Sequence, residues 1–260
     1  MNLLSNTKDA AFSKSKIINI NIDDVNCNQL TSKIYKSINE RKKLIINYAN
    51  ANSIRIIENK KEFKLALNCS NIIHSDGIGI WLASGILKSP KLINRFNFTD
   101  CALNFLKNCQ ENGWSLFLLG SNDKILNSAK NNIENRFPNL NITGMLNGYN
   151  DITSKNVIEI INLAKPDILW IGMGTPKQEM WIKENKDFLD CLIIQSVGDL
   201  ITHLASKKER GPLIVQKMGL EWTIRLINHP FKYFDRYILG IPIFLFLLIR
   251  ELANKRLFKI

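Results

Sequence analysis

The sequence is poor in cysteine and histidine, and neither residue type forms a recognisable pattern. Its 260 residues include five cysteines, none of them in a CxxC pair, and three histidines. A zinc site or a disulfide framework is therefore not expected, and a reduced compartment fits best. His203 and His229 have no ligand partners at metal spacing, so no metal site is predicted. The cysteines are Cys27, Cys69, Cys101, Cys109 and Cys191.

Long apolar runs are absent as well. No stretch of 18 consecutive apolar residues occurs, so a membrane-spanning helix is not expected. The densest run covers residues 238–249 and is interrupted by Gly240 and Pro242. The N-terminal residues lack the continuous apolar core of a signal peptide. These features predict a cytoplasmic protein.

Acidic residues are scarce relative to basic ones. The sequence has 23 Asp and Glu against 35 Lys and Arg, a formal net charge of +12. Such a surplus favours an anionic partner, which could be a nucleic acid, a phosphorylated metabolite or a lipid headgroup surface. No nucleic-acid reader motif is present, so a nucleic acid is not expected. Apolar residues make up 45% of the chain, which excludes wholesale disorder.

Short apolar runs alternate with helix-length segments along the first 200 residues. This alternation is typical of βαβ units around a parallel sheet. Several predicted strands end in glycine, and ligands of open α/β sheets bind at the carboxyl ends of the strands. The expected strands are residues 17–22, 44–46, 71–73, 114–119, 168–171 and 192–197, and the expected helices include 78–87, 123–137 and 153–164.

The composition changes near residue 200. Residues 201–260 contain 11 Lys and Arg against four acidic residues, a balance of +7, together with the apolar run 238–249. The predicted fold is therefore α/β. A Rossmann-like parallel sheet flanked by helices occupies residues 1–200, and a basic, partly apolar helical appendage follows at 201–260.

One string suggests a phosphate-binding turn. Gly172-Met-Gly174 follows an apolar run and precedes Pro176, so a strand would end in a glycine turn at a helix start. A merely tight turn is an equal alternative. The string lacks the third glycine of a dinucleotide fingerprint and the GK[ST] of a P-loop. A nicotinamide-dependent oxidoreductase is disfavoured, because it would need GxGxxG after the first strand and an acidic residue about 20 positions later.

A second string places a carboxylate at a predicted strand end. Asp76 follows His74-Ser75 and precedes Gly77, so its side chain could face a ligand crevice. The alternative is that Asp76 caps the following helix. His74 is interpreted as structural.

These strings, with several others, resemble the WecG/TagA/CpsF family, glycosyltransferase family 26. The resemblance covers residues 45–237 and rests on eight motifs in register. In this sequence they read Tyr48-Ala49-Asn50, Asp76-Gly77-Ile78-Gly79, Arg95 to Asp100, Leu119-Gly120, Pro138, Gly144 to Tyr149, Gly172 to Glu179, and Gly219-Leu-Glu-Trp222.

The resemblance implies an enzyme that transfers a sugar from a UDP-sugar, typically an N-acetylmannosamine-type or uronic acid donor. The acceptor would be a sugar on undecaprenyl diphosphate at the inner face of the cell membrane. The products would feed teichoic acid or cell-surface polysaccharide synthesis. The reaction would invert the anomeric centre without a metal or cofactor, and the sequence contains no Asp-x-Asp motif. Association into a homo-oligomer is left open.

The resemblance also assigns roles to individual residues. Asp76 is the candidate general base, which takes the proton of the acceptor hydroxyl. The turn from Gly172 through Gly174, with Arg225, would stabilise the leaving UDP. Tyr149 could stack on uracil, and Gln178 could hydrogen-bond the sugar. The remaining candidate substrate-binding residues are Asn50, Arg95, Gly120 and Arg236.

The sequence departs from the family pattern at several positions. Tyr48 stands where threonine is usual, Ser75 where proline is usual, and Phe98 where glycine is usual. Val197-Gly-Asp-Leu-Ile-Thr202 replaces a Val-Gly-Gly-x-Phe-Asp string. Lys232 replaces an arginine of the appendage. A catalytically weak paralogue that binds a UDP-sugar is the alternative function.

Overall fold

The computed structural model describes residues 11–149, 155–206 and 212–257. Its centre is an eight-stranded sheet in the order β1-β2-β4-β3-β8-β7-β5-β6. All neighbouring strands run parallel except β1 and β2, which form an antiparallel hairpin. The strands are β1 (Lys14–Ile17), β2 (Ile20–Asp23), β3 (Leu44–Ala49), β4 (Ile72–Ser75), β5 (Leu116–Gly120), β6 (Ile142–Leu146), β7 (Ile168–Gly172) and β8 (Ile193–Ser196).

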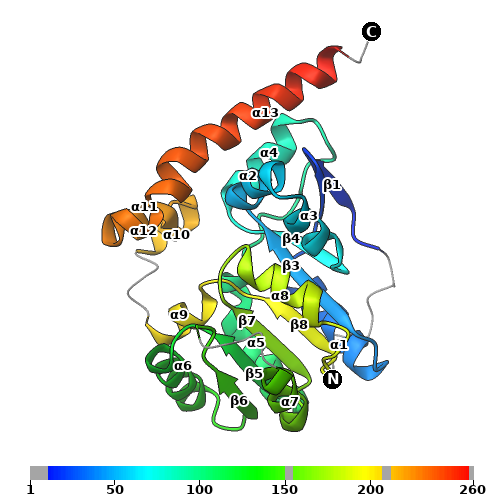
Figure 1. Cartoon of the computed structure of the whole chain (residues 1–260), viewed down its shortest axis with the longest axis vertical. Helices are drawn as coiled ribbons and strands as arrows, with labels where there is room; N and C mark the ends of the chain where they lie inside the picture. Colours follow the sequence, from blue (N-terminus) through cyan, green and yellow to red (C-terminus); the bar gives the residue numbers. More distant parts are fainter. Residues whose placement is uncertain (1–10, 150–154, 207–211, 258–260) are drawn as a thin grey trace.

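Helices cover both faces of this sheet, which gives three layers (Figure 1). One face carries α1 (Cys27–Asn39), α5 (Phe98–Asn112), α6 (Asp123–Arg136) and α9 (Leu200–Ala205). The other face carries α2 (Ala51–Asn59), α3 (Lys61–Asn68), α4 (Ile78–Ile86), α7 (Lys155–Ala164) and α8 (Lys177–Asn185). The predicted α/β class is confirmed.

The parallel strands are deeply buried, which explains why short apolar runs in the sequence predict their positions. Every residue of β3, β5 and β8 is buried, as expected for parallel strands covered on both faces. The predicted single strand 17–22 is wrong, because Ile18 adopts a positive φ and the chain reverses into the β1–β2 hairpin. The strings at 119–122 and 144–149 predict a βαβ unit, which is confirmed as β5, α6 and β6, although β6 is only partly buried and is not among the expected strand ranges.

The C-terminal segment forms α10 (Leu213–Met218), α11 (Glu221–Asn228), α12 (Pro230–Phe234), a π-helical turn η3 (Asp235–Leu239) and α13 (Gly240–Leu257). In Figure 1, α13 runs along the outer side of α2 and α4. Phe244, Leu247 and Leu248 bury one stripe of α13 in the same apolar cluster as Ile54 of α2. Two ion pairs add to this contact, Arg55 with Asp235 and Arg250 with Glu58.

A membrane-spanning helix was not expected, but one helix of the structure is long enough to cross a bilayer. Because η3 continues into α13, the 23 residues Asp235–Leu257 form one helix that is long and apolar enough to cross a bilayer. Gly240 and Pro242 do not end it, and the helix continues through both residues directly after the π-helical turn η3. Length and composition alone do not separate a spanning helix from one that packs against protein or lies on a surface.

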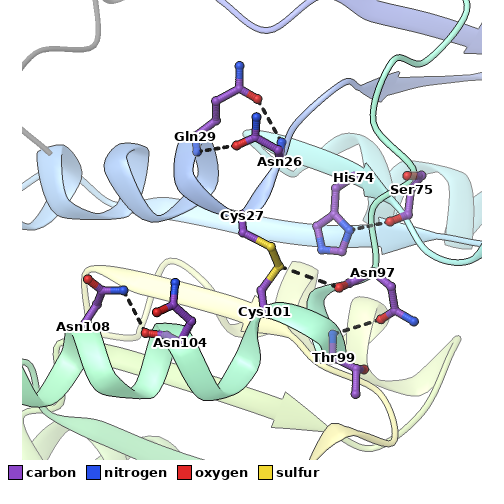
Figure 2. Close-up of a disulfide and its surroundings, with 10 residues drawn as sticks. All are labelled: Asn26, Cys27, Gln29, His74, Ser75, Asn97, Thr99, Cys101, Asn104 and Asn108. Carbon is purple, nitrogen blue, oxygen red and sulfur yellow. Dashed lines mark hydrogen bonds between the residues drawn. A yellow bond between two sulfur atoms is a disulfide. The ribbon is translucent and has the colours of Figure 1, made fainter. Parts of the chain in front are cut away.

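A disulfide joins the first residue of α1 to the first turn of α5. Cys27 and Cys101 are bonded, with their Cα atoms 5.7 Å apart and a sequence separation of 74 (Figure 2). The expectation of no disulfide is therefore wrong at this pair. It rested on spacing along the chain, whereas the pairing arises because α1 and α5 pack side by side on one face of the sheet.

The helix α9 belongs physically to the α/β core. Leu200 and Ile201 are buried in the cluster that contains α1, α5 and α6. Asn132 of α6 donates hydrogen bonds to the carbonyls of Leu204 and Ala205 at the end of α9. A truncation designed to remove the C-terminal helices should therefore keep residues up to 206.

Candidate active site

Asp76 lies at the carboxyl end of β4 and does not cap α4. The N-cap residue of α4 is Gly77, with φ of 83°, and no side chain caps this helix. The Asp76 Oδ2 atom instead accepts a hydrogen bond of 3.2 Å from Asn50 Nδ2. The Asp76 carboxylate is thus directed into the crevice beyond the sheet edge, which the capping interpretation would not allow.

Asn50 is fixed by its own helix. It is the N-cap of α2, where its Oδ1 atom accepts the Ser53 backbone N–H at 3.1 Å. Its amide nitrogen is left to face Asp76 from the neighbouring strand end. Since β3 and β4 are paired in parallel, with Ala49 opposite Ser75, the two loops emerge side by side.

A cavity of about 350 Å³ opens between these loops and the C-terminal helices. Asn50, Asp76 and Arg95 line it from the core, and Arg225 and Arg236 line it from α11 and η3. The cavity follows α4 from its start to Ile86, a length of about 12 Å at the rise of an α-helix. Along this path its wall becomes apolar, with Leu82, Ile86, Ile241, Phe244, Leu245 and Leu248. The cavity is therefore charged at one end and apolar at the other.

The arginines are held by contacts between the core and the C-terminal helices. Arg225 pairs with Asp199 at 3.2 Å and contacts His203 Nε2 at 3.0 Å. Burial is the largest single influence and opposes the charge on Arg225, but Asp199, Asp76 and the neighbouring tyrosines together outweigh it, so the pKa of Arg225 is raised. Arg95 donates to the Gln216 carbonyl at the end of α10 at 2.9 Å. The cations thus remain charged while they join the two parts of the chain.

Gly219 makes the close approach of α10 to the core feasible. It ends α10 in the left-handed conformation, and a Cβ there would lie 2.9 Å from both Arg95 Nη2 and Ile78 Cβ. The close packing of α10 against the core therefore explains why the first residue of the Gly219-Leu-Glu-Trp string is glycine. The same string brings Glu221 and Trp222 to the cavity wall.

A second, smaller cavity of about 50 Å³ lies beside Asp76, on the α5 side of the sheet edge. Gly174, Thr175, Arg225 and Arg236 line it as well, and its remaining wall includes Tyr48, His74, Asn97 and Phe98. Tyr48 is buried and fills the space beneath the turn after β8, where a Cβ on Gly198 would lie 2.5 Å from the tyrosine hydroxyl. Tyr48 and Phe98 stand where the family pattern has threonine and glycine, and their larger side chains narrow this cavity.

Gln178 is fully buried and holds two turns together. Its Oε1 atom accepts the backbone N–H groups of Gly174 and Gly198, each at 3.2 Å. Its amide nitrogen donates to Tyr48 and to Glu179 Oε1, at 3.1 and 2.8 Å. All four hydrogen-bonding positions are used within the protein. A contact between Gln178 and a sugar stays a prediction, and in this structure Gln178 shapes the site through the glycine turns.

Gly120, Gly172 and Tyr149 lie at the same sheet edge but line neither cavity. Gly120 sits where β5 and β7 end, and a Cβ there would collide with the Gly172 carbonyl at 2.4 Å. Tyr149 follows β6 and is 73% exposed. Their predicted roles in binding a nucleotide remain predictions. Within the described part of the chain, no group of three His, Cys, Asp or Glu side chains is arranged to hold a metal ion.

Glu179 is expected to make the stability of the fold depend on pH. Burial raises the pKa of Glu179 to about 7, although Gln178 and Thr175 donate hydrogen bonds to its carboxylate. The folded chain then binds the Glu179 proton more tightly than the unfolded chain does. This contribution is complete below the ordinary value of 4.5 and is lost as the pH rises to about 7.

Replacing Glu179 by Gln should remove this pH dependence. Between pH 5.5 and 8.5 the unfolding free energy of the unmodified protein should fall by about 2 kcal/mol relative to that of Glu179→Gln. Urea unfolding of both proteins at the two pH values measures this difference. Parallel pH profiles for the two proteins would contradict the assignment.

Comparison with known proteins agrees with this arrangement. The sequence model described as "Glycosyl transferase WecG/TagA/CpsF family" matches residues 15–257. Similar proteins from Staphylococcus aureus strains MW2 and COL are named N-acetylglucosaminyldiphosphoundecaprenol N-acetyl-beta-D-mannosaminyltransferase. Each is 28% identical over 235 residues, which cover 90% of this chain and 91% of the relative. Because the match spans both the sheet and the C-terminal helices that close the site, the chain belongs to the WecG/TagA/CpsF family of glycosyltransferases.

Proposed function

We propose that the protein is an inverting, metal-independent glycosyltransferase that uses a UDP-sugar donor and an undecaprenyl-diphosphate-linked sugar acceptor. The donor sugar is of the N-acetylmannosamine type or a uronic acid, and the product enters cell-surface polysaccharide or teichoic acid synthesis. The observation that carries this proposal is Asp76, which faces a cavity that is ringed by arginines at one end and apolar at the other.

Asp76 acts as the general base. As an acceptor hydroxyl oxygen attacks the anomeric carbon, Asp76 takes the hydroxyl proton, and the bond to the UDP oxygen breaks with its electron pair leaving on UDP. Attack from the face opposite to UDP inverts the anomeric centre. Asn50 Nδ2, 3.2 Å from Asp76 Oδ2, orients the carboxylate for this transfer.

Arginine side chains and backbone N–H groups stabilise the leaving UDP. Arg225 and Arg236 line both cavities, on either side of Asp76. Positive groups that are already in place offset the negative charge that develops on the diphosphate. The start of α8 lies at the same edge and offers backbone N–H groups to an anion, apart from those of Gly174 and Gln178, which are bonded within the protein.

The amphipathic cavity fits an acceptor that is itself amphipathic. The polar end would hold the acceptor sugar and diphosphate near Arg95, and the apolar slot between α4 and α13 would take the first isoprenoid units. A soluble sugar acceptor would have no use for the slot. The chemistry of this wall therefore favours a lipid-linked acceptor.

The same helices are proposed to dock on an anionic membrane. Side chains of Leu239, Ile243, Phe246 and Ile249 are exposed on the face of the helix opposite to its buried stripe. Arg256 is exposed in the last turn of α13, whereas Lys255 Nζ donates to the Leu87 carbonyl oxygen of the core. An interfacial helix of this kind places the enzyme on the inner face of the cell membrane, where the basic residues meet lipid headgroups.

The alternative is a catalytically weak protein that binds a UDP-sugar, and the narrowing of the smaller cavity by Tyr48 favours it. Turnover separates the two functions. The test is a donor screen with the full chain and a lipid-linked N-acetylglucosamine acceptor, with release of UDP as the readout. If the protein binds UDP but releases UDP from none of the donor sugars tested, the catalytically weak binding protein is the correct function.

UDP should bind and transfer should proceed without a divalent metal, because the arginines supply the positive charge. In excess chelator, the affinity for UDP measured by calorimetry should stay within about twofold of its value in magnesium. Loss of binding and transfer with chelator, restored by magnesium or manganese, would overturn this account of the leaving group.

A further inference from the structure

His74 is a buried side chain that uses only half of its hydrogen-bonding capacity. It is 1% exposed, at the third position of β4 and two residues before Asp76. Its Nδ1 atom lies 2.8 Å from the Ser75 carbonyl oxygen (Figure 2). Its Nε2 atom has no hydrogen-bond partner among the residues that the structure describes.

The partner at Nδ1 determines the state of the ring. A carbonyl oxygen only accepts, so Nδ1 carries the hydrogen and Nε2 carries a lone pair. Burial lowers the pKa of His74, and the Ser75 carbonyl and Asp76 offset this only in part. The ring is therefore neutral, and Nε2 is an acceptor without a donor. A buried acceptor left in this way has lost its hydration without compensation, and a suitable donor group on a ligand would supply the missing hydrogen bond.

The ring is held rigidly at the wall of the smaller cavity. Phe96 meets its edge, with the ring centroids 4.7 Å apart, and Phe98 lies on the same side. Tyr48 lies opposite His74 in the β3–β4 register, and both side chains line that cavity together with Asp76. An occupant of this cavity lies beside the proposed base and borders the His74 side chain, whose Nε2 atom is itself closed to solvent in this structure.

We propose that His74 is a specificity-determining residue whose Nε2 atom accepts a hydrogen bond from a hydroxyl or amide N–H group of the sugar that is transferred. This inference rests on the proposed function. A neutral acceptor selects an uncharged donor group at that position, because a carboxylate there has no proton to give and would meet the lone pair.

The contribution of His74 is measured by binding of UDP and of UDP-N-acetylmannosamine to the full chain. His74→Phe keeps an aromatic ring but removes the acceptor, and His74→Gln retains an acceptor near the position of Nε2. His74→Phe should weaken binding of the UDP-sugar about five- to tenfold and leave UDP affinity unchanged. His74→Gln should recover part of that loss. The exposed His229, replaced by Gln, is the matched control.

A measurement on the unmodified protein guards against a variant that does not fold. The chain has three histidines, so nitrogen NMR of histidine-labelled protein gives a simple spectrum. The Nε2 resonance of His74, identified by its loss in His74→Gln, should move when UDP-N-acetylmannosamine is added and stay in place with UDP.

The outcomes separate the two proposals. UDP binding with no shift of Nε2 by the sugar nucleotide, or equal sugar-nucleotide affinity in His74→Phe, would overturn the role of His74 and leave the proposed function standing. Failure of the unmodified protein to bind UDP would overturn the proposed function and this inference with it.

Discussion

Replacing Asp76 by Asn is expected to lower turnover by about 10²–10⁴-fold, the range typical of losing a general base. UDP affinity should remain nearly unchanged, because the groups proposed to hold UDP are Arg225, Arg236 and the start of α8. The amide of the variant can still accept the hydrogen bond from Asn50, so the local structure should persist. Release of UDP in the presence of donor and lipid-linked acceptor measures turnover.

A matched control is Asp190→Asn, which makes the same chemical change at an exposed carboxylate before β8, on the opposite edge of the sheet. Its turnover should equal that of the unmodified enzyme. If Asp76→Asn folds and turns over normally, the base must be sought among the other groups of the cavity wall, and the mechanism proposed for Asp76 would be wrong.

Removing the exposed apolar stripe of α13 should abolish membrane binding. The triple variant Ile243→Gln, Phe246→Gln and Ile249→Gln changes side chains that are 40%, 63% and 66% exposed and leaves the buried stripe intact. Each such side chain contributes about 1.5–3 kcal/mol when it is fully buried. Even partial insertion of the three should make vesicle binding at least about a hundredfold weaker in the variant.

Sedimentation with vesicles that contain anionic lipid measures this loss, and binding of the unmodified protein should weaken with added salt. The control is Leu163→Gln together with Phe188→Gln, two exposed apolar side chains near the other end of the molecule. If the triple variant sedimented as well as the unmodified chain, the stripe would be irrelevant to the membrane. If the free energy of unfolding of the triple variant equals that of the unmodified protein, the stripe does not stabilise the fold.

The features that local pattern predicts well are those that depend on neighbouring residues in sequence. Fully buried runs such as 116–119 predict the positions of parallel strands, whereas the residues around Asp76 alone favoured a helix cap, and only the family resemblance indicated a base facing a crevice. The continuity of the C-terminal helix was not predicted because Gly240 and Pro242 were interpreted as interruptions, whereas the helix continues through both.

Features that depend on contacts between residues distant in sequence could not be predicted from the local sequence pattern. The pairing of Cys27 with Cys101 requires α1 and α5 to be adjacent. The position of Gln178 beneath Gly198 requires the β7 and β8 turns to meet, and nothing in its own motif indicates that. His74 was interpreted as structural, and the unused Nε2 atom appears only when its surroundings are known.

The disulfide also has a topological consequence. It closes the backbone from Cys27 to Cys101 into a covalent ring, and this ring contains Asn50, His74, Asp76 and Arg95. One peptide bond cut in the exposed stretch around Ile93, which is 83% exposed, would therefore linearise the ring without releasing a fragment. A protein nicked there would migrate as a single species until a reductant separated it into two pieces. The base and the groups beside it would stay on one connected molecule after such a cut.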